Sequence, residues 1–139
     1  MLDVSPTPKS NSKRALVAGG VARVVGAPGY RRWEDASVWF ARQIRVGRQI
    51  DTLLVPIVVS ATFVMPRPKT VLKREGTGRK PSSKRPDMSN LCKALDDVLE
   101  RSGWIADDSQ IVEYRSTRKV RAAEGEQPKI EIELWEAKQ

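Results

Sequence analysis

The chain has 139 residues and a formal net charge of +8, because 25 lysines and arginines outnumber 17 aspartates and glutamates. This length suits a single domain, and a hydrophobic content of 40% is enough for a modest core. With no histidine and one cysteine, the sequence excludes an internal disulfide, a zinc finger and histidine-based acid–base catalysis. The positive charge makes nucleic acid a candidate partner, although a ribosome-like or merely basic surface is an open alternative.

The hydropathy of the chain gives no sign of a membrane protein. Its apolar runs are too short to cross a bilayer. The first ten residues, MLDVSPTPKS, lack the apolar core of a signal peptide. We therefore expect a cytoplasmic protein that does not bind membranes.

A basic loop is predicted near the N-terminus. Residues 6–14 read PTPKSNSKR, a composition that favours a loop. Lys9, Lys13 and Arg14 crowd this segment. From composition alone, a flexible tail is one interpretation of this segment.

A hairpin and a further strand are predicted in the first half of the chain. Two short apolar runs, residues 15–18 and 21–25, flank Gly19-Gly20, which is typical of a hairpin turn. Residues 55–65 are rich in β-branched side chains and predict a sheet strand. Pro56 restricts the start of that strand to a strand end or an edge position.

A helix is expected between the hairpin and this strand, from about Arg32 to Arg45. Its apolar side chains fall on one face: Trp33, Ala36, Phe40 and Ile44. We expect the aromatic side chains to pack in the core and not to stack on bases.

Residues 66–86 are predicted to form a flexible basic loop. The segment has little apolar content and several prolines and glycines. Its basic residues are Arg67, Lys69, Lys73, Arg74, Arg79, Lys80, Lys84 and Arg85. A loop this long in a compact domain is usually functional or disordered. One interpretation is that it neutralises phosphates of a nucleic acid, and the other is that it is a solvated linker.

A second helix should begin after Asp87, a residue type that favours the N-cap and accepts a bond from a free N–H group of the first turn. Apolar side chains then recur at helical spacing: Leu91, Leu95, Val98 and Leu99. Gly103 is placed to end the helix in a left-handed cap.

Two strands are predicted after this helix, over residues 110–120 and 128–136, with a turn at Glu124-Gly125-Glu126. Residues 129–134 alternate strictly between polar and apolar, so one face of that strand should be buried. The whole order predicts an α+β fold, a single domain over residues 1–139. Two main helices should pack on a mixed or mostly antiparallel sheet.

Several carboxylates flank the second helix, and they predict a metal site. Asp87 precedes the helix, and Asp107 and Asp108 follow it. Carboxylates without a His or Cys partner favour a hard cation such as Mg²⁺. In a basic protein this cation suggests phosphodiester chemistry, in which the metal polarises the phosphoryl oxygen and activates water. Lys93 lies about one helical turn after Ser89 and could point toward the same site. The alternative is that these residues are a helix cap, a solvated turn and a surface lysine.

Taken together, the pattern RPDxxNLxKALxDxL followed by DDSQI resembles the RusA family of Holliday-junction resolvases. The resemblance implies that Asp87, the position of Ser89 and Asp108 bind Mg²⁺, with Asp107 adjacent. It also implies that Lys93 is needed for cleavage. The chain departs from the family at Ser89, where a carboxylate is usual; a hydroxyl there is at most a weak ligand.

The same resemblance implies the fold and the partners. It implies a RusA-like α+β domain in a symmetric homodimer, whose two sites cut opposite strands of a four-way junction. It also places the basic segment of residues 6–14 near the DNA. The family usually has a full strand before this segment, and here residues 2–4 leave a short strand at most.

Three functions are therefore predicted as alternatives. The first is a Mg²⁺-dependent endodeoxyribonuclease that resolves Holliday junctions or other branched DNA by paired nicks during recombination and repair. The second is a structure-selective DNA-binding protein of the same fold in which Ser89 has impaired cleavage. The third is a general nucleic-acid-binding module whose acidic residues are caps and turns.

Overall fold

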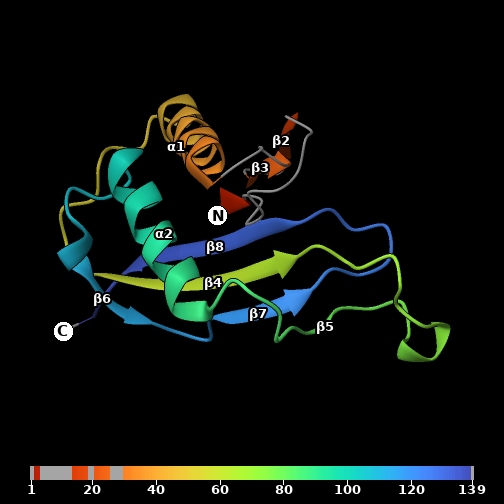
Figure 1. Cartoon of the computed structure of the whole chain (residues 1–139). Coiled ribbons are helices and arrows are strands. Elements are labelled where there is room, and N and C mark those ends of the chain that lie inside the picture. The colour runs from red at the N-terminus through yellow and green to blue at the C-terminus, as the bar shows by residue number, and fades with distance from the viewer. Residues whose placement is uncertain (1, 4–13, 19–20, 26–29, 139) are drawn as a thin grey trace.

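The structure, a computed structural model, describes residues 2–3, 14–18, 21–25 and 30–138, with side chains from Glu34 to Lys138. Its elements are β1 (Leu2–Asp3), β2 (Arg14–Ala18), β3 (Val21–Val25), α1 (Tyr30–Gly47), β4 (Ile57–Met65), η1 (Lys73–Glu75), β5 (Lys80–Pro81), α2 (Met88–Arg101), η2 (Asp108–Gln110), β6 (Ile111–Tyr114), β7 (Arg118–Arg121) and β8 (Lys129–Glu136). The prefix η marks a 3-10 helix. The expected α+β architecture, with two helices on a mixed sheet, is confirmed (Figure 1).

The main sheet is built around β4. This strand is antiparallel to β8, from Ile57 opposite Glu136 to Val64 opposite Lys129. On its other edge it runs parallel to β6 and then to β7. The strands β1 and β5 extend the sheet beside β8 and β7. The expected short N-terminal strand is present as β1, and the predicted hairpin is present as β2 and β3, while Gly19-Gly20 lie outside the described residues.

The prediction of one strand over residues 110–120 is wrong, because the chain divides there into β6 and β7. Ser116, between them, has a φ of 50°. The Arg115 N–H donates to the carbonyl of Val59, and the Ala61 N–H donates to the hydroxyl of Thr117. A residue with positive φ cannot continue a regular strand. The break lets each half pair with a different part of β4.

The predicted loop of residues 66–86 also contains regular elements, namely η1 and β5. Lys80 pairs with Arg121 and Pro81 with Val120, so β5 adds an edge to the sheet. The segment therefore returns along β7 before it reaches α2.

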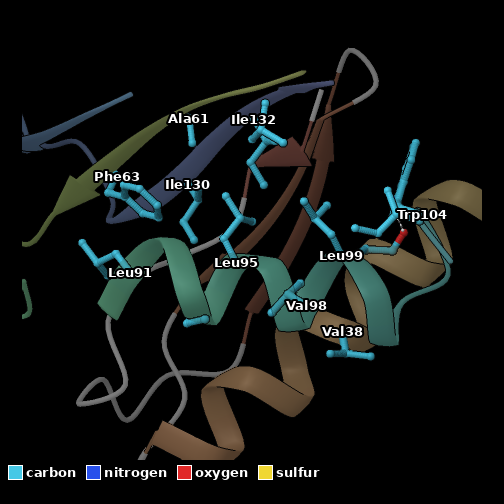
Figure 2. Packing of buried hydrophobic residues seen from close by; sticks show 14 of the residues in the cluster. Val38, Ala61, Phe63, Leu91, Leu95, Val98, Leu99, Trp104, Ile130 and Ile132 are labelled. Atoms are coloured by element: carbon cyan, nitrogen blue, oxygen red, sulfur yellow. Dashed lines mark hydrogen bonds between the residues drawn. The ribbon is translucent and has the colours of Figure 1, made fainter. Parts of the chain in front are cut away.

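The core lies between the sheet and one face of α2. The buried side chains of α2 are Leu91, Ala94, Leu95, Val98 and Leu99. Figure 2 shows the leucines directed at Phe63 of β4 and at Ile130 and Ile132 of β8. The alternation predicted for β8 is confirmed, because Ile130 and Ile132 are buried. Truncating one such leucine to alanine typically costs 2–5 kcal/mol, so this packing fixes where α2 lies.

The helix α1 covers the remaining part of α2. Val98 of α2 points toward Val38 of α1 (Figure 2). The indole N–H of Trp104 donates to the carbonyl of Ala41 at 2.7 Å. Of the face predicted to be buried on α1, Ile44 is buried and Phe40 is partly buried, and the side chain of Trp33 lies outside the described residues. In the described part of the chain, neither helix has the length and apolar content needed to cross a bilayer.

Candidate functional site

Asp87 occupies the N-cap position of α2, as predicted. Its carbonyl accepts the N–H of Leu91 at 3.0 Å. The expected capping bond of its side chain is not formed. The exposed carboxylate therefore stays available at the end of the helix where backbone N–H groups carry partial positive charge.

The segment before Asp87 is held by Lys119 of β7. The Lys119 ammonium donates to the carbonyls of Lys84 at 2.6 Å and of Pro86 at 3.0 Å. Its own carbonyl accepts the N–H of Ser82 at 3.1 Å. One residue of the sheet thus makes three hydrogen bonds to the segment that leads into α2.

The outer face of α2 carries the predicted Ser89 and Lys93. Both side chains are exposed, and no described residue pairs with the Lys93 ammonium. At 100° per residue, Ser89, Lys93 and Glu100 lie within about 40° of one another around the helix. Lys93 is therefore presented to solvent on the same stripe as a carboxylate two turns further along.

An acidic group forms where this stripe meets η2. One carboxylate oxygen each from Asp97, Glu100 and Asp108 lies within 4.8 Å of the other two. Asp97 and Glu100 are half-buried and Asp108 is exposed. Three oxygen ligands from carboxylates suit a hard divalent cation such as Mg²⁺ or Mn²⁺, which prefers oxygen and keeps some water. The residues present therefore fit the metal that the sequence predicts.

Asp96 lies beside the acidic group, where it contacts Tyr114 of β6. The Tyr114 hydroxyl donates to its carboxylate and lies 3.3 Å from the carbonyl of Cys92. Burial raises the pKa of Asp96, and the charges of Asp108 and Asp97 raise it further, against the effect of the Tyr114 bond. Burial also raises the pKa of Tyr114, so its hydroxyl keeps its proton.

Asp107 has a structural task in η2. Its carboxylate accepts the Ser109 N–H at 2.8 Å, and hydrogen bonds from Ser109 lower its pKa. Gln110 completes the turn, because its amide oxygen accepts the N–H groups of Ala106 and Asp107 and its amide nitrogen donates to Leu53 and Val55. These bonds fix η2 against the end of α2 and so position Asp108.

Asp87 lies apart from this acidic group. Ten residues separate it from Asp97, which corresponds to about 15 Å along the axis of α2. Among the described residues, the predicted set of Asp87, Asp107 and Asp108 forms no group of mutually close oxygens, whereas Asp108 does so with Asp97 and Glu100. The role of Asp87 as a metal ligand stays a prediction.

The predicted DNA-binding residues divide into two kinds. Arg79 forms ion pairs with Glu126 and Glu131, and Arg67 donates to the carbonyls of Gly76 and Ala122. The others in the loop have exposed side chains: Lys69, Lys73, Arg74, Lys80, Lys84 and Arg85. Lys9 and Lys13 lie outside the described residues, and Arg14 is described only through the backbone of β2.

Comparison with known proteins places the chain in a family. A family model described as Endodeoxyribonuclease RusA matches residues 3–135. The chain belongs to the RusA family. It is also 29% identical to the crossover junction endodeoxyribonuclease RusA of Aquifex aeolicus (strain VF5) over 115 residues, which are 83% of this chain and 75% of that protein. The resemblance found in the sequence motifs is thereby confirmed.

Sequence reasoning missed Asp97 and Glu100 as members of the acidic group. The available signal was their spacing of three residues, which puts two carboxylates on one helix face outside the apolar stripe. That signal is weak, since acidic pairs are common on solvated faces. The case for a metal site becomes stronger because the chain after α2 brings Asp108 close to these two carboxylates.

Proposed function

We propose that this protein is a divalent-cation-dependent endodeoxyribonuclease that resolves Holliday junctions or other branched DNA by paired nicks. The observation that carries the proposal is the convergence of the Asp97, Glu100 and Asp108 carboxylates in a member of the RusA family. The proposed substrate follows the name of the Aquifex relative, a crossover junction endodeoxyribonuclease.

In this proposal Asp97, Glu100 and Asp108 hold the cation, with Mg²⁺ as the physiological choice. A bound cation of this kind supplies Lewis-acid activation of a phosphodiester and lowers the pKa of water. Lys93 contributes a solvent-facing ammonium group that offsets negative charge on the phosphoryl oxygens. Asp87 and Ser89 are exposed at the other end of the same helix.

Nicking of a synthetic four-way junction in Mg²⁺ or Mn²⁺ tests the proposal. We expect paired nicks with the native chain and a loss of at least about 100-fold with Asp108→Asn, since a metal ligand contributes several kcal/mol to the transition state. Glu133→Gln is the matched control, because Glu133 is exposed on β8 away from the acidic group. No nicking under conditions where the junction is bound would contradict the proposal.

Calorimetric titration with Mg²⁺ separates the two sets of ligands. Asp97→Asn and Glu100→Gln should weaken cation binding as much as Asp108→Asn does. Asp87→Asn should leave cation binding in place if the acidic group alone holds the metal. The opposite pattern, with binding lost only in Asp87→Asn and Asp108→Asn, would favour the ligand set predicted from the sequence. Unchanged binding in all four variants would favour a general nucleic-acid-binding module.

A second candidate function follows from Ser89, where a carboxylate is expected for the family. In this reading the chain binds branched DNA and cuts it poorly. The substitution Ser89→Asp restores a charged oxygen ligand on the exposed first turn of α2. Cleavage that appears only in Ser89→Asp would make the native chain a binding protein, whereas efficient native cleavage would exclude this function.

We further propose that the active form is a homodimer, since paired nicks on opposite strands need two active sites. Sedimentation equilibrium should give a mass near twice the 15.6 kDa of one chain. A monomer at concentrations that support nicking would contradict this part of the proposal.

A further inference from the structure

Arg121, at the end of β7, has hydrogen-bonding capacity that the described residues do not use. Its side chain is 15% exposed and places Nη1 3.4 Å from a carboxylate oxygen of Glu75. Its Nε and Nη2 are buried, and no described residue accepts a bond from either. Buried polar atoms in native proteins almost always have partners, and leaving donors of a charged group unpaired is costly. The guanidinium therefore has the capacity to bind an anion more fully than Glu75 does.

Glu75 holds this position through few contacts. It is the last residue of η1, and its other carboxylate oxygen accepts the N–H of Leu72 at 3.0 Å. Its pKa is lowered, first by that bond and then by Arg121 and Arg67, so the group is a carboxylate at neutral pH. The Glu75 side chain is 44% exposed, which means that solvent and solutes reach the ion pair.

A second guanidinium, that of Arg67, also lowers the pKa of the Glu75 carboxyl. Arg67 donates to the carbonyl of Gly76 at 2.8 Å and to that of Ala122 at 3.3 Å. It therefore joins the residue after η1 to the residue after β7. An open cavity of about 850 Å³ adjoins it, lined by Arg67, Lys69 and Lys73 and by the turn of residues 123–128.

A phosphodiester can accept more of the Arg121 donors than a single carboxylate oxygen does. The guanidinium presents donors in a planar fork that suits two oxygens of one anion, and Arg is the usual residue for phosphate recognition. Lys73 and Arg74 are exposed on η1 itself, so an approaching phosphate meets positive charge before it reaches Glu75. Figure 1 shows η1 at the end of the sheet away from the helices.

We propose that Arg121 and Arg67 form a phosphate-binding site for a DNA arm, and that Glu75 occupies this site in the free protein. A DNA phosphate exchanges with the Glu75 carboxylate and takes the free donors of Arg121. The exchange releases η1 from the sheet and lets Lys73 and Arg74 follow the DNA backbone. The inference rests on the proposed function in one respect, because DNA is taken as the source of the phosphate.

Equilibrium binding of a fluorescent four-way junction in EDTA, over a series of salt concentrations, tests the site without cleavage. In the native chain, a phosphate that binds Arg121 replaces the negative charge of Glu75, so the net charge neutralised at Arg121 is small. In Glu75→Gln there is no carboxylate to replace, so the phosphate neutralises the full charge of Arg121. We expect tighter binding by about two- to fivefold and a steeper plot of log K against log salt by about 0.9.

Glu124→Gln is the matched control, because it removes one negative charge from the exposed turn that lines the same cavity. It should leave the slope unchanged. The effect of Glu75→Gln should also vanish when Arg121 is replaced by Gln in the same chain, as a double-mutant cycle detects. Equal slopes in Glu75→Gln and Glu124→Gln would overturn the proposal. So would a Glu75→Gln effect that persists without Arg121.

The binding test of the phosphate site and the nicking test of the nuclease proposal can fail independently. If the Glu75–Arg121 coupling appears and the chain nicks no junction in Mg²⁺ or Mn²⁺, the phosphate site stands and the nuclease fails. If the chain nicks junctions and the coupling is absent, the nuclease stands and the phosphate site fails.

Discussion

Asp96 is one of the half-buried acidic side chains on α2. It lies beside Asp97 and Asp108 and accepts a hydrogen bond from Tyr114. Folding raises the pKa of this carboxyl above its usual value, mainly through burial. Its ionised form therefore lowers stability, and the arrangement is tolerated because the Tyr114 hydroxyl stabilises the charge.

We predict that Asp96→Asn stabilises the protein at pH 7. The amide oxygen keeps the bond from Tyr114 and removes the penalised charge. The gain in the free energy of unfolding should stay below about 1 kcal/mol, because water screens a half-exposed group. A group with a raised folded pKa destabilises above that pKa, so the gain should disappear as the pH falls toward the unfolded value near 4. Urea unfolding at pH 7 and pH 3.5 measures this, and a gain that grows in acid would contradict it.

Two different sets of hydrogen bonds fix the two ends of α2. Gly103 has a φ of 82°, its N–H donates to Glu100, and the Trp104 N–H donates to Leu99. This is the left-handed cap expected from the sequence, in its Schellman form. It turns the chain toward η2 and so delivers Asp108. At the other end, Lys119 holds the segment that leads to Asp87.

We predict that Gly103→Ala destabilises the protein by about 1–2 kcal/mol. Alanine is strained at this φ, and a Cβ would lie 2.9 Å from the guanidinium of Arg45. Gly47→Ala is the control, since a Cβ there meets nothing within 4 Å and the position is helical. The control should be neutral or gain up to about 1 kcal/mol. Similar midpoints of urea unfolding for the two variants would show that the cap does not matter.

We predict that Lys119→Met loosens the entry to α2. Two carbonyls lose a charged donor, which should cost about 1–3 kcal/mol of unfolding free energy. Hydrogen exchange should accelerate at the amides of residues 82–91. Lys119→Arg should recover part of the loss, and Arg118→Met, on an exposed side chain of the same strand, should have little effect. Exchange rates that match in Lys119→Met and Arg118→Met would count against this role of Lys119.

At the scale of the whole molecule, the acidic group and the exposed basic residues of η1 lie far apart. Figure 1 shows η2 and η1 at opposite ends of the sheet. Asp108 of the acidic group lies in η2, and the exposed Lys73 and Arg74 lie in η1. The nine residues of β4 that lie between these ends span about 30 Å. A substrate that touches both ends must therefore be extended, which suits an arm of branched DNA.

We predict that the exposed cations of the loop set the salt dependence of DNA binding. Replacing Lys73, Arg74, Lys80 and Lys84 by Ala should flatten the slope of log K against log salt by about three to four units. Arg79 is left out because its ion pairs with Glu126 and Glu131 tie the loop to the sheet.

A double variant at Arg48 and Lys138, both exposed and outside the loop, serves as the comparison. It should keep the native slope. Binding titrations at 50–300 mM salt, roughly the range in which such contacts are resolved, measure both variants. An unchanged slope in the four-residue variant would mean that DNA binds elsewhere.

The sequence by itself determined the elements whose signals are local. The apolar stripe and the terminal glycine predict α2, the β-branched run predicts β4, and the strict alternation predicts β8. The motifs around Asp87 and Asp108 were also sufficient to identify the family. These elements can be predicted without tertiary information because helical and strand periodicity depend on neighbours a few residues apart.

Only the tertiary structure decided which charged groups meet. Asp108 lies with Asp97 and Glu100 because the cap at Gly103 and the turn at η2 direct the chain back to the end of α2. Arg79 finds Glu126 at a separation of 47 residues. The break at Ser116 lets β6 and β7 pair with different halves of β4. Contacts between distant segments depend on the direction of turns and on sheet register, and local periodicity carries neither.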